Sequence, residues 1–337
     1  MRVPAVRFSI VTPTHRRPQS LLRMLDALAR QDYPCACFEV IVVVDGHDEG
    51  LMQRLAANQY PFRLRALDQA QSGPATARNR GLAEAAESHV LFLDDDVIPG
   101  PQLVRRHAES HADADVVVIG PLLAADAALA APWTRWEWAT LKEQYRAMEA
   151  GDWAPTPRQF YTGNASVRLD HVKAVGGFNP DFKRAEDVEL AWRLHKLGLR
   201  FAFNPRAEAE HLAQRSFGAW LNAANEYGRA DVMLERIRTG RELPGWVRRE
   251  FPTRHPYTKA LTRAVLKQPV SWRAVVPFAR VLTAAANRAG MRSTAMRVCS
   301  ALFTAAYWRG VAGELGRSQA LALTAPEQVQ ATAESTA

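Results

Sequence analysis

Short apolar runs alternate with segments of helical spacing over the first 120 residues. The apolar runs are rich in β-branched residues and predict buried strands at residues 6–11, 38–44, 62–67, 89–93 and 116–119. Between them, apolar residues recur at helical intervals, which predicts helices at residues 20–31, 50–59, 74–87 and 101–110. This repetition predicts an α/β fold with a parallel, doubly wound sheet, in which ligands bind at the carboxyl ends of the strands.

Residues 121–160 interrupt this alternation. Four tryptophans stand there among proline, alanine and charged residues: Trp133, Trp136, Trp138 and Trp153. One interpretation is an amphipathic helix whose tryptophans pack on the core, and the other is an acceptor-binding or mobile flap. Residues 161–213 then resume the strand and helix pattern, with a helix expected at 187–197 and a strand at 200–203.

Strand signals vanish from Arg215 onward. Alanine, leucine and arginine at helical spacing predict a helical extension at residues 214–325, and residues 326–337 are expected to be a disordered tail. Breaks in the helical pattern are expected at the prolines: Pro244, Pro252, Pro256, Pro269 and Pro277.

The composition is that of an ordinary globular protein, with 337 residues, 47% hydrophobic, 23% charged and 3 Cys. It excludes whole-chain disorder, a collagen-like repeat and a disulfide scaffold. The net charge of +8 is unevenly placed, because residues 1–214 hold 25 basic and 27 acidic residues whereas residues 215–337 hold 18 and 8. The first residues do not resemble a signal peptide and no window of 18 uninterrupted apolar residues occurs, so we expect a cytoplasmic protein without a membrane span.

Polar residues follow the predicted strands at the edge where ligands bind. Asp45 ends the second strand, where its carboxylate can accept hydrogen bonds from a ligand, although loop aspartates are also common caps. Gly73 and Pro74 open the next helix and leave backbone N–H groups free for an anion. Arg78 lies one turn further and either faces that anion or is a solvated surface residue.

Three consecutive carboxylates, Asp94, Asp95 and Asp96, follow the fourth strand. They repel one another, and no arginine stands beside them in the sequence. A divalent cation is the simplest explanation, since hard oxygen ligands suit Mg²⁺ or Mn²⁺, and the alternative is an acidic turn.

Two later segments add acidic residues and a histidine. Glu186 and Asp187 stand at the start of a predicted helix, where acidic residues commonly complement the helix dipole. Residues 207–211 alternate like a short strand and end on His211, whose interpretation as a metal ligand depends on the upstream aspartates.

In their order and spacing, these motifs resemble those of the family 2 inverting glycosyltransferases. The likeness covers residues 5–213 and rests on Thr12-Pro13-Thr14-His15-Arg16-Arg17-Pro18, Asp45, Ala77-Arg78-Asn79-Arg80-Gly81, Leu93-Asp94-Asp95-Asp96, Gly163-Asn164, Gly176-Gly177-Phe178 and Glu186-Asp187 with Leu190 and Arg193. The resemblance implies a GT-A fold with a Rossmann-like, mostly parallel sheet. It further implies a glycosyltransferase domain at residues 1–213, with a nucleotide-sugar half at 1–120 and an acceptor half at 121–213.

The resemblance also implies residue roles. Asp187 would be the general base, with Glu186 supporting it. Asp96 matches the metal-holding member of the family's D-x-D signature, and His211 matches a further ligand of Mn²⁺ or Mg²⁺. The nucleotide-sugar, for which UDP is the expected nucleotide, would be bound by Thr12, Pro13, Thr14, Asp45, Arg78, Asp94, Asp95, Gly163 and Asn164.

The chain departs from the family pattern at two places. His15 stands where the family often has tyrosine or phenylalanine, which alters stacking on the nucleotide base. The Q-x-x-R-W signature of processive synthases is absent, since Gln214-Arg215-Ser216-Phe217 does not fit it. We therefore expect single addition of a sugar to a cell-envelope, polysaccharide or lipid-linked glycan. The alternatives are a nucleotidyltransferase on the same type of sheet and a non-catalytic nucleotide-sugar-binding module.

The basic last third of the chain has three interpretations. It carries no zinc-finger spacing or aromatic RNA-binding signature, so a nucleic-acid partner is not expected. A plain solvated helical domain would need no partner. The favoured interpretation attaches residues 215–325 to an anionic membrane surface, because residues 270–282 and 295–311 mix aromatic side chains with arginines as interfacial helices do.

Overall fold

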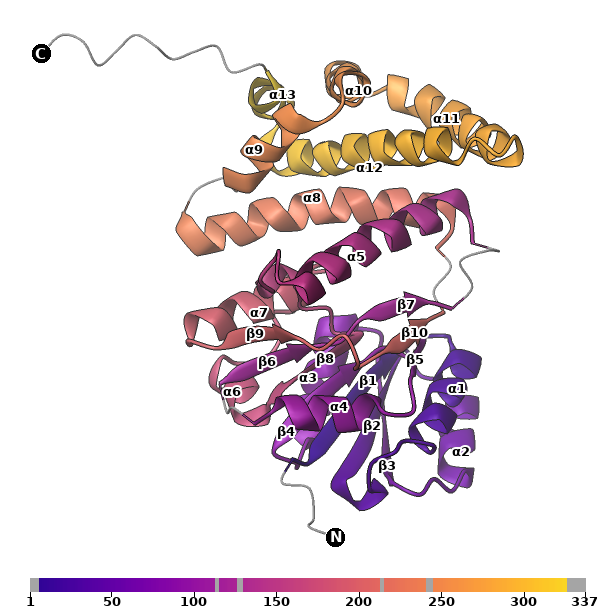
Figure 1. Ribbon diagram of the computed structural model, residues 1–337, viewed down its shortest axis with the longest axis vertical. Coiled ribbons are helices and arrows are strands. Elements are labelled where there is room, and N and C mark those ends of the chain that lie inside the picture. Colours follow the sequence, from indigo (N-terminus) through magenta and orange to yellow (C-terminus); the bar gives the residue numbers. More distant parts are fainter. Residues whose placement is uncertain (1–5, 113–114, 126–129, 213–214, 241–244, 326–337) are drawn as a thin grey trace, which may run out of the picture. The chain divides into compact units, whose positions relative to one another are not determined.

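The computed structural model describes residues 6–112, 115–125, 130–212, 215–240 and 245–325 (Figure 1). The chain divides into two compact units. We call residues 1–130 and 137–214 the α/β unit, and residues 131–136 and 215–337 the helical unit. The predicted break at Pro244 and the predicted disordered tail at 326–337 lie outside the described residues.

The α/β unit is built on a seven-stranded sheet with the order β3-β2-β1-β4-β8-β6-β9. Most neighbouring strands are parallel, as predicted, but β8 runs antiparallel to both β4 and β6. Hydrophobic spacing marks a strand without encoding its direction, which depends on where the preceding connection enters the sheet. The strands are β1 Phe8–Thr14, β2 Phe38–Asp45, β3 Arg63–Gln69, β4 His89–Leu93, β6 Val116–Ile119, β8 Asn164–Arg168 and β9 Arg200–Phe203.

Helices cover both faces of this sheet. Phe8 and Ile10 of β1 point into one hydrophobic cluster and Val11 into the other, because successive strand residues face opposite sides. The first cluster contains α1 Pro18–Leu28, α2 Glu49–Ala57 and α4 Leu103–Ser110, and the second contains α3 Pro74–Glu84, α6 Leu169–Ala174 and α7 Glu186–Lys196. The doubly wound arrangement is therefore as the sequence predicts.

A second sheet of three short strands was not fully expected. Its order is β5-β10-β7, formed by β5 Val97–Pro99, β10 Ala209–His211 and β7 Leu122–Ala124. Strands of three residues are too short to carry a hydrophobic period, so the sequence pattern reveals only β10. The antiparallel pairing of β10 with β5 sets His211 opposite Val97, the residue that directly follows the acidic triplet.

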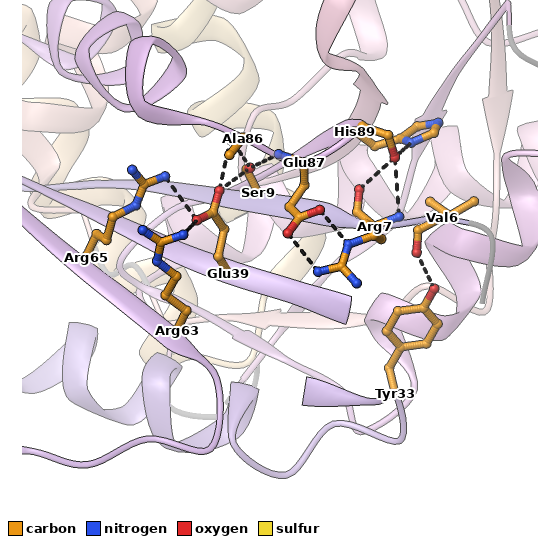
Figure 2. A network of polar contacts seen from close by, with 11 residues as sticks. Val6, Arg7, Ser9, Tyr33, Glu39, Arg63, Arg65, Ala86, Glu87 and His89 are labelled. Atoms are coloured by element: carbon orange, nitrogen blue, oxygen red, sulfur yellow. Dashed lines mark hydrogen bonds and ion pairs between the residues drawn. The ribbon is translucent and has the colours of Figure 1, made fainter. Parts of the chain in front are cut away.

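A buried carboxylate ties together the amino-terminal ends of the strands (Figure 2). Glu39 on β2 accepts hydrogen bonds from the Ser9 hydroxyl at 2.7 Å and the Ala86 N–H at 3.1 Å, and it pairs with Arg65 at 3.0 Å. Nearby, Arg7 pairs with Glu87 at 2.6 Å. These partners compensate the cost of burying the Glu39 charge. This polar network lies at the opposite end of β2 from Asp45.

The segment 121–160 forms mainly the long helix α5 Pro132–Ala150. Trp133 and Trp136 pack in a hydrophobic cluster of the helical unit, whereas Trp138 packs in the first cluster of the α/β unit. Trp153 is exposed beyond the end of the helix. Three of the four tryptophans thus follow the interpretation of a helix packed on the core.

Over the residues that the structure describes from 215 to 325, the helical unit contains six further helices, in agreement with the loss of strand signals after Arg215. Two prolines that were expected to break helices lie inside them, Pro252 in α9 and Pro277 in α11. Pro277 is exposed, so its missing N–H and its ring are accommodated on the solvent side of the helix. The helices are α8 Phe217–Thr239, α9 Gly245–Thr253, α10 Pro256–Lys267, α11 Ser271–Arg288, α12 Arg292–Leu315 and α13 Arg317–Thr324.

Helix α12 forms the centre of this unit and corrects one expectation. Trp308 is only 3% exposed, and Leu302 and Val311 are fully buried. The prediction that residues 295–311 form an interfacial helix is therefore wrong, because α8 and the other helices enclose the aromatic face of α12. Within the described residues, no helix is both long and apolar enough to cross a membrane.

Helices α8 and α12 approach closely through two glycines. A methyl group on Gly310 would lie 1.8 Å from the backbone oxygen of Asn225, and one on Gly228 would lie 2.0 Å from that of Tyr307. Gly310→Val is therefore expected to destabilise the protein by at least about 3 kcal/mol, since backbone cannot yield as a flexible side chain can. Thermal or denaturant unfolding measures the loss. Gly218→Ala, also in α8 but with open space around it, should change stability little; equal effects of both variants would contradict this packing.

Candidate functional site

The acidic triplet lies where the sheet topology brings the ends of β1 and β4 together. The Thr14 hydroxyl, at the end of β1, donates a hydrogen bond of 2.7 Å to Asp95 Oδ2. Arg17 Nη1 donates to Asp95 Oδ1 at 3.2 Å and also pairs with Asp96 Oδ2. The sequence offered no arginine beside the triplet, but the fold supplies one from the segment after the neighbouring strand.

The surroundings shift the pKa values of the buried Asp95 and Asp96 carboxyl groups in opposite directions. Burial raises the pKa of Asp95 to about 6, although Thr14 and Arg17 oppose that rise. Burial alone would also raise the pKa of Asp96, but His211 and Arg17 hold it below its usual value. Asp96 is therefore the more firmly ionised of the pair and the better candidate for a cation ligand.

Asp96 and His211, the two predicted metal ligands, lie side by side. Asp96 Oδ1 lies 3.4 Å from His211 Nε2, and the indole of Trp138 packs edge-on to the imidazole with 5.4 Å between ring centres. Two ligands at right angles, each about 2.1 Å from a metal, are themselves about 3 Å apart, so the pair fits Mg²⁺ or Mn²⁺. No group of three or more histidine, cysteine or acidic side chains able to hold a metal occurs among the described residues.

Arg78 joins the acidic triplet to the helix that carries Asp187. Its Nη2 pairs with Asp94 Oδ1 at 2.7 Å and its Nη1 with Glu186 Oε1 at 2.8 Å. The Arg78 side chain is only 5% exposed, and its guanidinium also lies 5.6 Å from the centre of the Phe178 ring. Arg78 is thus not the solvated surface residue that was its alternative interpretation.

Asp187 lies partly buried among charged neighbours and keeps some access to solvent. The side chain is half-buried, and desolvation followed by the neighbouring charge of Glu186 raises the pKa of Asp187 to about 7. Arg78 and the Val188 N–H, which donates to Asp187 Oδ1 at 2.8 Å, limit the rise. A carboxylate with a pKa near neutrality can accept a proton at physiological pH, which an ordinary surface aspartate does poorly.

Asp45 holds the loop before α3. Its Oδ1 accepts hydrogen bonds from Gln69 Nε2 at 2.9 Å and the Ser72 N–H at 2.7 Å, while its Oδ2 accepts from the Gly73 N–H at 2.9 Å. Gly73 adopts φ 91°, a conformation that other residues rarely take, directly before Pro74 starts the helix. Asp45 therefore shapes this helix start, and its direct contact with a ligand stays a prediction.

The other residues expected around the nucleotide lie along the end of β1. Thr12 is fully buried and its hydroxyl finds no hydrogen-bond partner among the described residues, whereas Pro13 keeps part of its surface exposed. His15 lies against Gly46, and its Nδ1–H donates to the backbone oxygen of Asp45. This imidazole is therefore fixed at the ends of β1 and β2.

Gly163 and Asn164 occupy different environments. A methyl group on Gly163 would lie 3.4 Å from Asp94 Oδ2, so the bare glycine leaves room beside the triplet. Asn164 is fully buried, with its Nδ2 donating to Pro121 O at 3.1 Å and Ala207 O at 2.7 Å. Its Oδ1 accepts from His107 Nε2 at 2.9 Å. The Asn164 side chain is thus directed into the fold.

Comparison with known proteins identifies the family of the chain. Residues 4–230 match the family described as "Glycosyltransferase like family 2". The chain belongs to glycosyltransferase family 2. The family resemblance inferred from the motifs is thereby confirmed. Validoxylamine A glucosyltransferase of Streptomyces hygroscopicus subsp. jinggangensis is 31% identical over 222 residues, covering 57% of this chain and 52% of that protein. The family 2 chain therefore spans about half the length of this relative.

Solved structures share the fold of this family 2 chain. The mannosyltransferase PcManGT from Pyrobaculum calidifontis, in complex with GDP-Man and Mn²⁺, aligns with a TM-score of 0.64 at 22% identity, over 91% of this chain and 88% of that one. Residues 1–349 of Staphylococcus aureus TarS, in complex with UDP-GlcNAc, align with a TM-score of 0.51 at 18% identity, over 87% and 90%. The expected GT-A fold with C-terminal helices is thus confirmed.

Two residues in the family 2 motifs serve as scaffold. Asn79 exchanges hydrogen bonds with the backbone of Phe178, accepting at 2.7 Å and donating at 2.8 Å. Arg193 donates to the Gly177 oxygen at 2.6 Å and pairs with Glu189 at 2.6 Å. Sequence reasoning assigned these residues no role. Their positions within the motifs indicate that these residues matter. Position alone does not show whether such a residue contacts a ligand or holds the backbone of a neighbouring segment.

The bridge made by Arg78 in this family 2 chain gives a stability prediction. Arg78→Met is expected to lower the free energy of unfolding by about 3–5 kcal/mol near neutral pH, because the carboxylates of Asp94 and Glu186 lose their buried partner. Without the guanidinium these carboxyls bind protons more readily in the folded state, so the loss should shrink as the pH is lowered. Unfolding measured across a pH series tests both points.

An exposed ion pair in the α/β unit provides the control. Arg105 pairs with Asp32 at the same kind of distance, 2.8 Å, but the two side chains are 41% and 56% exposed. Arg105→Met should therefore change stability far less than Arg78→Met. Equal losses in the two variants, or a loss for Arg78→Met that does not depend on pH, would contradict the buried bridge.

Proposed function

We propose that this protein transfers a sugar with inversion from a nucleotide-sugar to an acceptor hydroxyl. Support comes from its membership of family 2 and, above all, from the ion pairs of Arg78 with Asp94 and Glu186. Inversion needs a base on one face of the sugar and a means of stabilising the departing diphosphate on the other. The Arg78 bridge brings candidates for both devices, Asp187 and the acidic triplet, into one network.

The proposed donor pocket follows the carboxyl ends of β1, β2 and β4. Asp45 and the end of β1 would surround the base and ribose, Arg78 and the first two aspartates of the triplet would face the ribose and diphosphate, and Gly163 would leave space for the sugar. We propose a UDP-linked donor, as expected from the resemblance. Asn164 would act on the pocket by holding Pro121 and Ala207 in place, since its amide is already hydrogen-bonded to them and to His107.

Asp96 and His211 are the residues that would hold Mn²⁺ or Mg²⁺. When bound, such an ion would neutralise negative charge on the diphosphate, which removes the need for an acid beside the leaving group. The 3.4 Å separation of the two side chains supports this assignment. Arg17 pairs with Asp96 Oδ2, whereas His211 lies beside Oδ1. The arginine and the ion would therefore share this carboxylate.

Asp187 would take the acceptor's proton. As the acceptor oxygen forms its bond to the anomeric carbon, the bond from that carbon to the diphosphate breaks and the hydroxyl proton passes to the Asp187 carboxylate. Burial and Glu186 raise the Asp187 pKa to about 7, which suits a base that must accept a proton near neutral pH. Glu186 would support this role through its influence on the Asp187 pKa and its pairing with Arg78.

We assign residues 1–213 as the transferase domain and residues 214–325 as a basic extension. The acceptor would be a glycan of the cell envelope, a polysaccharide or a lipid-linked glycan, reached from the cytoplasmic face of a membrane.

The test is release of free nucleoside diphosphate from a panel of nucleotide-sugars in the presence of Mn²⁺. Sugar transfer releases a nucleoside diphosphate, whereas a nucleotidyltransferase releases pyrophosphate from a nucleoside triphosphate. Donors that raise the melting temperature identify the ligand of the folded state. Binding without turnover across a range of glycan acceptors would support a non-catalytic module and contradict the proposal.

A further inference from the structure

Helix α11 carries apolar residues on two faces. Ala279, Thr283 and Ala286 are buried, and α11 lies beside α12 (Figure 1). Phe278 is 70% exposed, Val281 67% and Leu282 41%. Residues three or four positions apart share one side of a helix, so these three side chains form a common apolar face. A helix that is apolar on both sides is ordinarily covered on both.

Apolar side chains next to both ends of the helix are exposed as well. Val270, immediately before α11, is 78% exposed, and Met291, directly before α12, is 53% exposed. Aromatic and aliphatic side chains gathered in this way mark an interaction surface, whereas single exposed apolar residues need no explanation. We call Phe278, Val281 and Leu282 the α11 face.

The chain segment that contains the α11 face carries charge of one sign. Residues 251–313 contain ten arginines and lysines and no aspartate or glutamate. Four of the arginines are exposed on α11 itself or at the start of α12: Arg273, Arg280, Arg288 and Arg292. A partner for this surface must therefore be apolar and negatively charged at once.

We propose that the α11 face binds the surface of a bilayer containing anionic phospholipids. Phe278 and its aliphatic neighbours would enter the boundary between headgroups and acyl chains, while the arginines contact lipid phosphates. A second copy of the chain fits less well, because a symmetric contact would set this acid-free surface against itself. The inference concerns α11 specifically, since the aromatic side chains of α12 are enclosed in the helical unit.

Co-flotation with lipid vesicles tests the proposal on the whole chain. The protein should float with vesicles containing phosphatidylglycerol and remain behind with pure phosphatidylcholine. Binding should weaken at about 1 M NaCl, where the Debye length falls to about 3 Å. The double variant Phe278→Ser with Val281→Ser should reduce vesicle affinity about tenfold or more, because it removes apolar surface that lipid would cover.

Ile237→Ser is the matched control, since Ile237 on α8 is also an exposed apolar residue of the helical unit at 58%. It should leave flotation unchanged, and both variants should keep the wild-type melting temperature. Failure of the wild-type chain to float with anionic vesicles, or equal flotation of the double variant, would overturn the proposal. If the wild-type protein is a dimer that does not respond to lipid, and the double variant is a monomer, the α11 face binds a second copy of the chain and the proposal is overturned. None of these outcomes depends on glycosyl transfer.

Discussion

Asp187→Asn is expected to lower the rate of sugar transfer by about 10²–10⁴-fold, the range that general-base catalysis contributes. Asparagine keeps the size of the side chain but cannot take the acceptor's proton. Donor affinity should remain close to that of the wild-type protein, because the substitution leaves the acidic triplet intact. Steady-state rates of nucleoside diphosphate release and donor binding by calorimetry measure the two effects separately.

The pKa of Asp187 adds a signature to this prediction. Wild-type activity should fall as the pH is lowered through about 7, because the base becomes protonated. The pKa of Asp187 is about 7 in the folded state, above its ordinary value of 3.8. Ionisation of Asp187 therefore lowers the free energy of unfolding as the pH rises from 3.8 toward 7. Asp187→Asn should therefore be at least as stable as the wild-type protein above neutral pH, which distinguishes loss of a base from misfolding.

Asp170 supplies the matched control. It is the second residue of α6, as Asp187 is the second residue of α7, but hydrogen bonding to Arg168 lowers the pKa of Asp170 to about 2. Asp170→Asn should leave transfer and its pH profile unchanged. Full activity in Asp187→Asn would remove this residue from the role of base.

Asp96→Ala is expected to abolish the part of nucleotide-sugar affinity that depends on Mn²⁺, a loss of about tenfold or more. The alanine cannot serve as a ligand, so the diphosphate would have to bind with its charge less neutralised. Calorimetry with Mn²⁺ and with EDTA measures the difference. In the wild-type protein EDTA should reproduce the loss, and in Asp96→Ala it should add nothing.

Two further variants separate the metal ligand from the ion pair it makes. His211→Ala should cause a similar loss, and combining it with Asp96→Ala should give less than the sum of the two effects because both act on one ion. Arg17→Met breaks the pair with Asp96 but leaves both ligands in place, so it should retain Mn²⁺-dependent binding. Affinity that is unaffected by EDTA in the wild-type protein would contradict the metal assignment.

Local sequence determined most of the elements, because the spacing of apolar residues reflects which side of each element is buried. The strands at 89–93 and 116–119 have the expected bounds, and α3 begins at Pro74 as the Gly73-Pro74 pair predicts. Local sequence could not show the direction of β8, which depends on the path of the chain, nor the three-residue strands β5 and β7, which are too short for a period. The prediction that prolines break helices is wrong at Pro277, which lies on the exposed side of α11.

For the candidate site, sequence by itself determined which chemical groups are available and that Asp45 and the acidic triplet follow strands. Only the tertiary structure decided their partners. The order of strands set Arg17 beside Asp95 and Asp96, and the packing of α3 and α7 on one face of the sheet set Arg78 between Asp94 and Glu186. Asp170 and Asp187 both stand second in their helices, yet their pKa values lie near 2 and 7. Arg168, two residues along the chain, lowers the pKa of Asp170, whereas the burial that mainly raises the pKa of Asp187 comes from the tertiary structure.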